Sequence, residues 1–282
     1  MPRFLWLHLV PIVRCQRNTD APVIPDMPAD RFPYEFVPKI QPSHHVDQKV
    51  YGHNDEHAKW VTCPFHRSTW FVNHPREAFL SPDQKLHVST YEQDKHIVDR
   101  TPDDEIERYI ELEGIADAAT PGDRFTYDYE WMSRREVTKE IEDSVHRQLT
   151  IYEALKDQNI NLTLIPAFLG WEDWHLERCR PLLEINTSVA FDTTQINSKY
   201  DKQKQLETLD EVIDPDRVFV NGTVAGSHLR LMPRSVVAFS GKVSILDEIR
   251  DANGVHHRDW LSESIEKRIP EINNWQAKLT QF

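Results

Sequence analysis

Short apolar segments that alternate with helical segments are the feature that most constrains the fold of this chain. From about residue 60 onward, runs rich in β-branched and aromatic residues alternate with stretches whose apolar residues recur every three or four positions. Strands are expected at Trp60 to Cys63, Trp70 to Val72, Leu86 to Ser89, Phe125 to Tyr129, Leu162 to Phe168, Ser188 to Phe191, Val218 to Val220 and Val236 to Phe239. Helices are expected at Asp103 to Glu113, Arg135 to Asp157, Trp171 to Leu183 and Lys202 to Ile213. This order is typical of parallel strands joined by helical crossovers, and it predicts an α/β fold.

Two closures of such a sheet compete, a (β/α)₈ TIM-like barrel and an open doubly wound sheet. About eight strand segments without a dinucleotide or P-loop glycine spacing favour the barrel. No Gly/Ser linker divides the chain, so we expect a single domain over residues 1–282. Residues 18–60 carry six prolines and four histidines with weak periodicity, and they predict an irregular wrapping segment. We interpret Met1 to Val13 as a buried first strand rather than a signal peptide.

The composition excludes several classes of protein. Hydrophobic residues make up 39% of the chain, which is too high for a disordered protein, and no run approaches the length of a membrane-spanning helix. A net charge of −13 argues against general affinity for nucleic acid, although a local basic groove could still bind phosphates. The three cysteines are too far apart for a disulfide framework or a zinc knuckle, and they indicate a reducing, cytoplasmic compartment.

Strand ends supply the candidate site residues, because ligands of parallel α/β folds bind at the carboxyl ends of the strands. The segment Phe125 to Trp131 ends in Asp128 and Glu130, which strand alternation points the same way. We expect Asp128 to be catalytic and Glu130 to bind substrate. In the structural alternative, either carboxylate caps the following helix or pairs with Arg134 or Arg135.

Three further predicted strands run into a glycine that has a polar or aromatic neighbour. Gly170 and Trp171 form one such end, where glycine admits close approach of a ligand and tryptophan offers a stacking face. Asn221 and Ser240 each precede a glycine at the other two ends. We expect these four residues to bind substrate, although a turn between a strand and a helix often needs glycine for itself. Asp192 ends another strand and is the second catalytic candidate, with capping of the next segment as its alternative.

A metal site is a separate possibility. His53, Asp55 and His57 lie at short spacing, as in the ligand set of a metal-dependent hydrolase, but they also fit a solvated polar loop. No Gly-x-Ser-x-Gly motif supports a serine hydrolase. We expect neither a bound metal nor a cofactor. A carboxylate- or metal-dependent barrel hydrolase that uses the strand-end acids is kept as an alternative function.

The stretch from Arg135 to Trp174, together with Phe125 to Glu130, resembles the tRNA-guanine transglycosylase superfamily, and within it the paralogues that insert 7-deazaguanine into DNA. The resemblance covers roughly residues 100 to 245. It implies a TIM barrel in which an aspartate attacks the anomeric carbon, guanine leaves and a deazaguanine takes its place. It also implies that nucleic acid, DNA rather than tRNA, and a 7-deazaguanine base are the partners, with Asp128 holding the base beside Gly170. The oligomeric state stays open.

The chain departs from the family pattern at three positions. His87 to Gln93 contains no aspartate where the family carries Asp-Ser-Gly, Ser240 stands where the nucleophile is expected, and Leu169 replaces a glutamine. No cysteine-rich zinc site follows. The resemblance therefore implies either that Asp192 or Glu92 serves instead, or that the fold is kept with altered or lost catalysis. A non-catalytic binding subunit is the remaining alternative.

Overall fold

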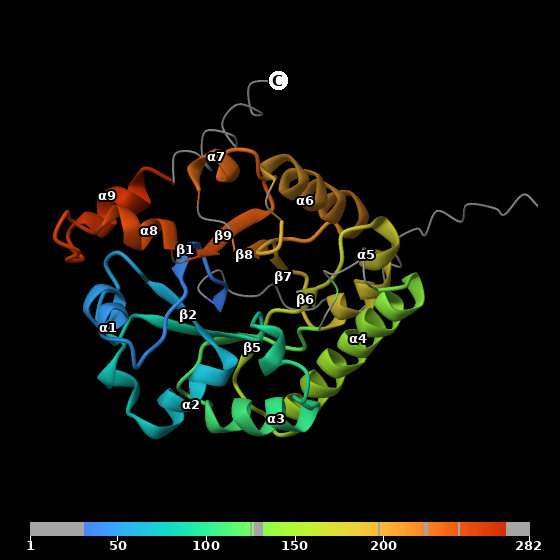
Figure 1. The fold of residues 1–282 in the computed structure, drawn as a ribbon. Helices are drawn as coiled ribbons and strands as arrows, with labels where there is room; N and C mark the ends of the chain where they lie inside the picture. Colours follow the sequence, from blue (N-terminus) through green and yellow to red (C-terminus); the bar gives the residue numbers. More distant parts are fainter. Residues whose placement is uncertain are drawn as a thin grey trace, which may run out of the picture.

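The computed structural model describes residues 31–124, 126, 132–196, 198–222, 225–241 and 243–268. Figure 1 shows its strands in the middle of the molecule and its helices around them. The strands are β1 (Glu35–Pro38), β2 (Trp60–Pro64), β3 (Lys85–Ser89), β4 (Ala118–Thr120), β5 (Thr163–Leu164), β6 (Ala167–Phe168), β7 (Val189–Asp192), β8 (Val218–Asn221) and β9 (Val236–Gly241). The helices are α1 (His45–Tyr51), α2 (Phe65–Asn73), α3 (Pro102–Glu111), α4 (Arg134–Asp157), α5 (Asp173–Cys179), α6 (Lys199–Ile213), α7 (Gly226–Leu229), α8 (Val243–Glu248) and α9 (Trp260–Glu266). Three short 3₁₀ helices, η2 (Arg76–Ala78), η3 (Asp94–His96) and η4 (Arg180–Glu184), lie between them.

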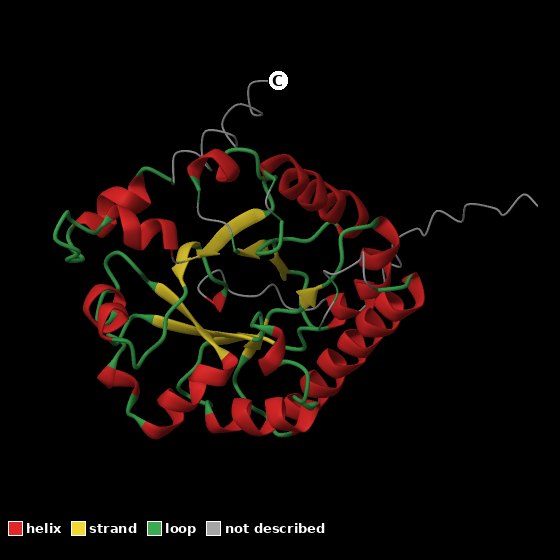
Figure 2. Ribbon diagram, in the orientation of Figure 1, coloured by secondary structure: helices red, strands yellow, loops and turns green. Residues whose placement is uncertain are grey.

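The strands form two sheets in which every ladder among the described residues is parallel. One sheet has the order β1-β9-β8-β7-β6 and the other has the order β2-β3-β4-β5. Figure 2 shows the helices as an outer layer around these strands. The prediction of an α/β fold with parallel strands and helical crossovers is confirmed.

The two sheets are linked at both ends of their strand order. At one end, Lys39 directly after β1 forms a parallel bridge with Thr62 of β2. At the other end, β5 and β6 are separated by Ile165 and Pro166. The amide of Ile165 donates to a β4 carbonyl, and the carbonyl of Pro166 accepts from a β7 amide, both at 2.8 Å. Backbone hydrogen bonds therefore continue from each sheet toward the other.

The core lies between the two sheets and beneath the helices. The buried ring of His87 on β3 packs edge-to-face on Phe219 of β8, with ring centroids 5.0 Å apart. Its two ring nitrogens each lie 2.9 Å from a threonine hydroxyl, those of Thr62 and Thr120. The contact with Phe219 joins the two sheets, and the threonine hydroxyls give both polar nitrogens of the buried ring a partner.

Local sequence signals position the helices. Thr101 and Asp104 form a capping box at the start of α3, and Ser133 and Glu136 form another at the start of α4. Burial of Val137 and other apolar residues at three- and four-residue spacing fixes one face of α4 on the core. The predicted helices over residues 103–113, 135–157, 171–183 and 202–213 correspond to α3, α4, α5 with η4, and α6.

Some elements differ from the expectation. Trp70 to Val72, expected as a strand, lies in α2, where Phe65, Ser68 and Phe71 are buried at helical spacing. The stretch 18–60, expected to be irregular, contains β1 and α1 in its described part. The expected strand at Phe125 to Tyr129 falls, apart from one residue, outside the described residues, and so does the expected first strand at Met1 to Val13.

Among the described residues, no helix combines the length and the apolar character that crossing a membrane requires. The expectation of a cytoplasmic location stays a prediction.

Candidate functional site

Polar side chains gather where the strands of both sheets end. They line a cavity of about 470 Å³. Its lining includes Lys39 after β1, Tyr91 and Glu92 after β3, Asp123 after β4, Asp192 at the end of β7 and Asn221 at the end of β8. Because parallel strands bring their carboxyl ends to the same edge, groups far apart in the sequence converge on this cavity.

Lys39 places an amine among acids. Its Nζ donates a hydrogen bond of 2.8 Å to the main-chain oxygen of Tyr91, which holds the side chain across the strand ends. Burial lowers the pKa of Lys39 below its ordinary value, while the charges of Asp192, Glu92 and Asp123 act in the opposite direction. The amine is therefore easier to deprotonate than that of an exposed lysine.

Asp123 and Asp192 both line this cavity, and the charge of Asp192 acts on Asp123. Asp123 is 7% exposed, and burial, reinforced by the charge of Asp192, raises its pKa well above the ordinary value. Burial also raises the pKa of Asp192, but its carboxylate accepts hydrogen bonds of 2.5 Å from the Thr194 hydroxyl and from the Asn221 amide. These bonds and the nearby Lys39 charge oppose the rise. Asp123 is thus the better proton donor and Asp192 the better carboxylate.

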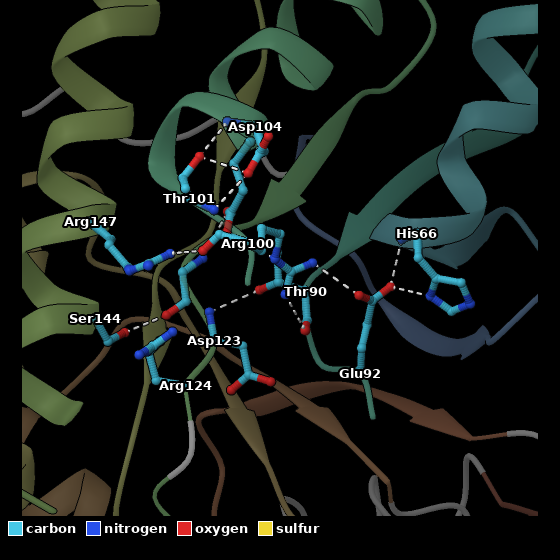
Figure 3. A network of polar contacts seen from close by, with 12 residues as sticks. His66, Thr90, Glu92, Arg100, Thr101, Asp104, Asp123, Arg124, Ser144 and Arg147 are labelled. Atoms are coloured by element: carbon cyan, nitrogen blue, oxygen red, sulfur yellow. Dashed lines mark hydrogen bonds and ion pairs between the residues drawn. The ribbon is translucent and has the colours of Figure 1, made fainter. Parts of the chain in front are cut away.

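A buried ionic network behind the cavity fixes Glu92. Figure 3 shows the Glu92 carboxylate between His66 and Arg100. Its oxygens accept from the main-chain N–H of His66 at 2.8 Å, lie 2.7 Å from His66 Nδ1, and accept from Arg100 at 2.9 Å. Arg100 also pairs with Glu105, at 3.4 Å. The side chains of Glu92 and Glu105 are each 1% exposed, so both depend on Arg100 for their counter-charge.

The same network holds the loop that carries Asp123. The other oxygen of Glu105 accepts the N–H of Gly122 at 3.0 Å. The N–H of Asp123 itself donates to the Thr90 hydroxyl at 3.1 Å, as Figure 3 also shows. The main chain at Gly122 and Asp123 is therefore held by buried partners on the segment that follows β3 and on α3.

A second cavity of about 470 Å³ adjoins the first and shares Asp123 and Asp192 with it. Gly170 and Trp171 line this cavity. Gly170 has a φ of 84°, and a Cβ at its position would lie 2.5 Å from the Cβ of His175. Glycine is needed there because the turn packs closely on His175. This agrees with the alternative that the turn itself, and not a ligand, requires glycine at this position.

The structure brings some of the predicted site residues together and leaves others untested. Asp192 and Asn221 are hydrogen-bonded to each other in the first cavity. Ser240 is Asn221's partner in the β8–β9 ladder, is fully buried, and has a hydroxyl without a hydrogen-bond partner among the described residues. Asp128 and Glu130 lie outside the described residues. The substrate-binding and catalytic roles of all of these residues remain predictions.

Among the described residues, the side chains of the histidine-rich stretch make contacts other than those of a metal centre. Asp55 accepts a hydrogen bond of 2.7 Å from the Ser81 hydroxyl, and the His57 ring lies 2.9 Å from the hydroxyl of Ser262. Within the described ranges, no group of three or more His, Cys, Asp or Glu side chains is arranged to hold a metal ion. These contacts favour the polar-loop interpretation of His53, Asp55 and His57.

Sequence reasoning missed Lys39, Tyr91 and Asp123. Asp123 follows the strand Ala118–Thr120 and the turn residues Pro121 and Gly122. The strand has small residues, which do not give the β-branched or aromatic pattern that predicts a strand. Lys39 was hidden in the proline-rich stretch, although Phe36-Val37-Pro38 immediately precedes it. The signal that could have found both is a charged residue directly after a short buried segment.

The fold and the site define the class of this protein. It is an α/β protein with parallel strands, and a polar cavity at their carboxyl ends contains buried acids and an amine. No family model matches the chain, and no curated protein matches it. A solved structure titled "Native KDPGal structure" is similar, at 10% sequence identity and a TM-score of 0.47, over 86% of this chain and 96% of that chain.

These comparisons correct the expected family. The resemblance to tRNA-guanine transglycosylases is wrong, and the base exchange inferred from it falls with it, since no family model and no curated protein match the chain. The physical reason is that the resemblance depended on strand order and strand-end glycines, which any parallel α/β fold supplies. The expected nucleic-acid and 7-deazaguanine partners are not tested by the described residues.

Proposed function

We propose that this protein is an enzyme that forms an imine between Lys39 and the carbonyl carbon of a small polar substrate. The observation that carries the proposal is the shared cavity of Lys39, Asp123 and Asp192. A buried amine with a lowered pKa is the usual requirement for a lysine nucleophile. Buried acids with raised pKa values supply proton transfer at neutral pH.

Each group has a role in the proposed reaction. The neutral Lys39 amine attacks the carbonyl carbon, and the π electrons of the C=O bond move to its oxygen. Asp192 takes the proton that the amine loses, and protonated Asp123 gives its proton to the oxygen. The proton on Asp192 then returns to the resulting hydroxyl group, which leaves as water. The products are a protonated imine on Lys39 and two carboxylates, so that charge and protons balance.

The polar lining indicates the class of substrate. Asn221, Thr194, Gln195 and Lys95 border the reacting groups and offer hydrogen-bond donors and acceptors. Such a lining suits a short carbonyl compound that carries hydroxyl or carboxylate groups. The size of the cavity, about 470 Å³, agrees with a small molecule.

Reductive trapping tests the proposal. The protein is incubated with pyruvate, as a ketone, or glyceraldehyde, as an aldehyde, in the presence of cyanoborohydride, and the adduct is located by peptide mass spectrometry. We expect one rapidly formed adduct on Lys39 that Lys39→Arg abolishes. Lys139→Arg is the control, because Lys139 is exposed on α4 and does not line the cavity. Equal labelling of Lys39 and surface lysines with both compounds would contradict the proposal.

We also propose that the two sheets close into one (β/α)₈ barrel in which β5 and β6 serve as a single interrupted strand. Support comes from the bridge between Lys39 and Thr62 and from the hydrogen bonds of Ile165 and Pro166 to strands on either side. A closed barrel predicts slow amide exchange at Ile40, which donates to the Thr62 carbonyl at 2.8 Å. Exchange there as fast as in an exposed loop would indicate an open edge between β1 and β2.

A further inference from the structure

Tyr91 is buried at the first cavity, and its hydroxyl has no hydrogen-bond partner among the residues that the structure describes. Tyr91 is 3% exposed and lines the cavity together with Lys39, Asp123 and Asp192. Within the described part of the chain, its hydroxyl makes no hydrogen bond. A buried hydroxyl without a partner costs free energy, so its retention beside reacting groups points to a partner that arrives with the ligand.

The backbone of Tyr91 is firmly held, and this fixes the phenol. Its N–H donates to the Ser89 hydroxyl at 3.2 Å, and its carbonyl oxygen accepts from Lys39 Nζ at 2.8 Å. The residue that anchors the amine therefore also carries the free hydroxyl. Lys39 and Tyr91 line the same cavity, so a group bound to Lys39 shares that cavity with Tyr91.

The electrostatic surroundings keep the phenol protonated. Burial, reinforced by the charges of Asp123 and Asp192, raises the pKa of Tyr91 well above its ordinary value. At neutral pH the hydroxyl therefore donates a hydrogen bond and does not act as a base. A protonated donor in the same cavity as the attacking amine has the chemistry of an oxyanion-stabilising group.

We infer that Tyr91 is a catalytic residue whose hydroxyl donates a hydrogen bond to the carbonyl oxygen of the substrate while Lys39 attacks the carbon. This inference rests on the proposed function of Lys39. As the bond between Nζ and carbon forms, negative charge moves to the oxygen, and the Tyr91 O–H stabilises it without losing its proton. Asp123 then protonates the oxygen. The donor proposed to recognise the carbonyl in this site is thus the side chain of a tyrosine.

Replacement of Tyr91 by phenylalanine isolates the hydroxyl, because Lys39 binds the main-chain oxygen and keeps its anchor. The matched control is Tyr51→Phe, since Tyr51 on α1 is also fully buried and its hydroxyl also has no partner among the described residues. The assay is the rate of Lys39 labelling by pyruvate and by glyceraldehyde with cyanoborohydride, together with the Tm of each variant.

Tyr91→Phe is expected to slow Lys39 labelling by about tenfold or more, and to leave the Tm unchanged or raise it. Tyr51→Phe is expected to label at the wild-type rate with a similar Tm. Wild-type labelling of Lys39 in Tyr91→Phe would overturn the inference and leave the proposed function intact. A Tm lower by several degrees in Tyr91→Phe alone would also overturn it, because the hydroxyl would then have a structural partner. If the wild-type protein does not label Lys39 with either compound, the proposed function fails first.

Discussion

Removal of the Arg100 charge is expected to destabilise the protein severely, because Arg100 is the shared counter-ion of two buried acids. Its side chain is 6% exposed, and those of Glu92 and Glu105 are each 1% exposed. The Arg100–Glu92 distance is 2.9 Å and the Arg100–Glu105 distance is 3.4 Å. In Arg100→Met the volume is largely kept, but both acids lose their charge partner in a medium of low dielectric constant.

The magnitude follows from the cost of an uncompensated buried charge. Breaking a buried pair by removing one partner costs about 3–5 kcal/mol. For a protein of this size, that loss lowers the Tm by roughly 6–20 °C. The control is Lys267→Met, since Lys267 and Glu263 form an exposed i,i+4 pair at 2.8 Å, and we expect a loss below about 1 kcal/mol there.

The loss of stability in Arg100→Met is expected to depend on pH, and the pKa of Glu105 gives the direction of that dependence. Burial raises the pKa of Glu105, and the Arg100 charge opposes the rise. In Arg100→Met the pKa of Glu105 therefore rises further, and the native state binds a proton more tightly than the unfolded state. Stability then falls as the pH rises above the unfolded pKa, so the difference from wild type is smaller at pH 5 than at pH 8.

Urea unfolding at both pH values measures the effect, and the double variant with Glu105→Gln is expected to recover part of the loss. An equal loss at both pH values, or a loss below about 1 kcal/mol, would refute the assignment of Arg100 as the buried counter-ion.

Two further predictions concern the strand ends. Asp123→Asn should abolish Lys39 labelling but stabilise the fold at pH 8. The raised pKa of Asp123 makes its ionised form unfavourable in the native state, and each pKa unit of the rise costs about 1.4 kcal/mol once the pH exceeds the folded pKa. Urea unfolding should show no such gain near pH 4, and a less stable variant at pH 8 would contradict the burial argument. Gly170→Ala should cost about 2–4 kcal/mol, from a left-handed φ of 84° and a Cβ 2.5 Å from His175. Gly114→Ala separates the two causes, because its φ is 73° with nothing within 4 Å, so an equal loss at both glycines would exclude the steric contribution.

The elements that could be predicted from the sequence are those with strong local signals. The long apolar stripe of α4 predicts a helix whose bounds agree with the structure to within one residue. β2, β3, β7, β8 and β9 follow from their β-branched and aromatic residues. β1 could not be predicted as a strand, because it spans only Glu35–Pro38 and lies among prolines. Its position in the sheet is set by pairing with β9 at the other end of the chain.

The site was predicted only in part, and the reason is the location of one strand. β4 consists of Ala118–Thr120, three small residues that are fully buried because β3 and β5 flank them. Its neighbours in space, not its own hydrophobicity, make it a strand. The aromatic run that follows looked like the better strand, so the acid at its end was sought at Asp128 and not at Asp123. Asp192 and Asn221 line the cavity, and they could be predicted as strand-end residues because β7 and β8 were expected at nearly their observed bounds.

A perturbed pKa does not by itself distinguish a working site from a packed core, and His87 shows why. Burial lowers the pKa of His87 to about 3, yet both ring nitrogens have threonine partners, and His87 lines neither of the two cavities at the strand ends. Its neutral ring is therefore satisfied within the fold. Lys39, Asp123 and Tyr91 differ because they border a cavity and because burial shifts the pKa of each group away from its ordinary value, a shift that the charges and hydrogen bonds around Lys39 and Asp123 only partly offset. Groups retained at such a cost, on segments held by the Arg100 network, are best explained by a ligand that binds among them.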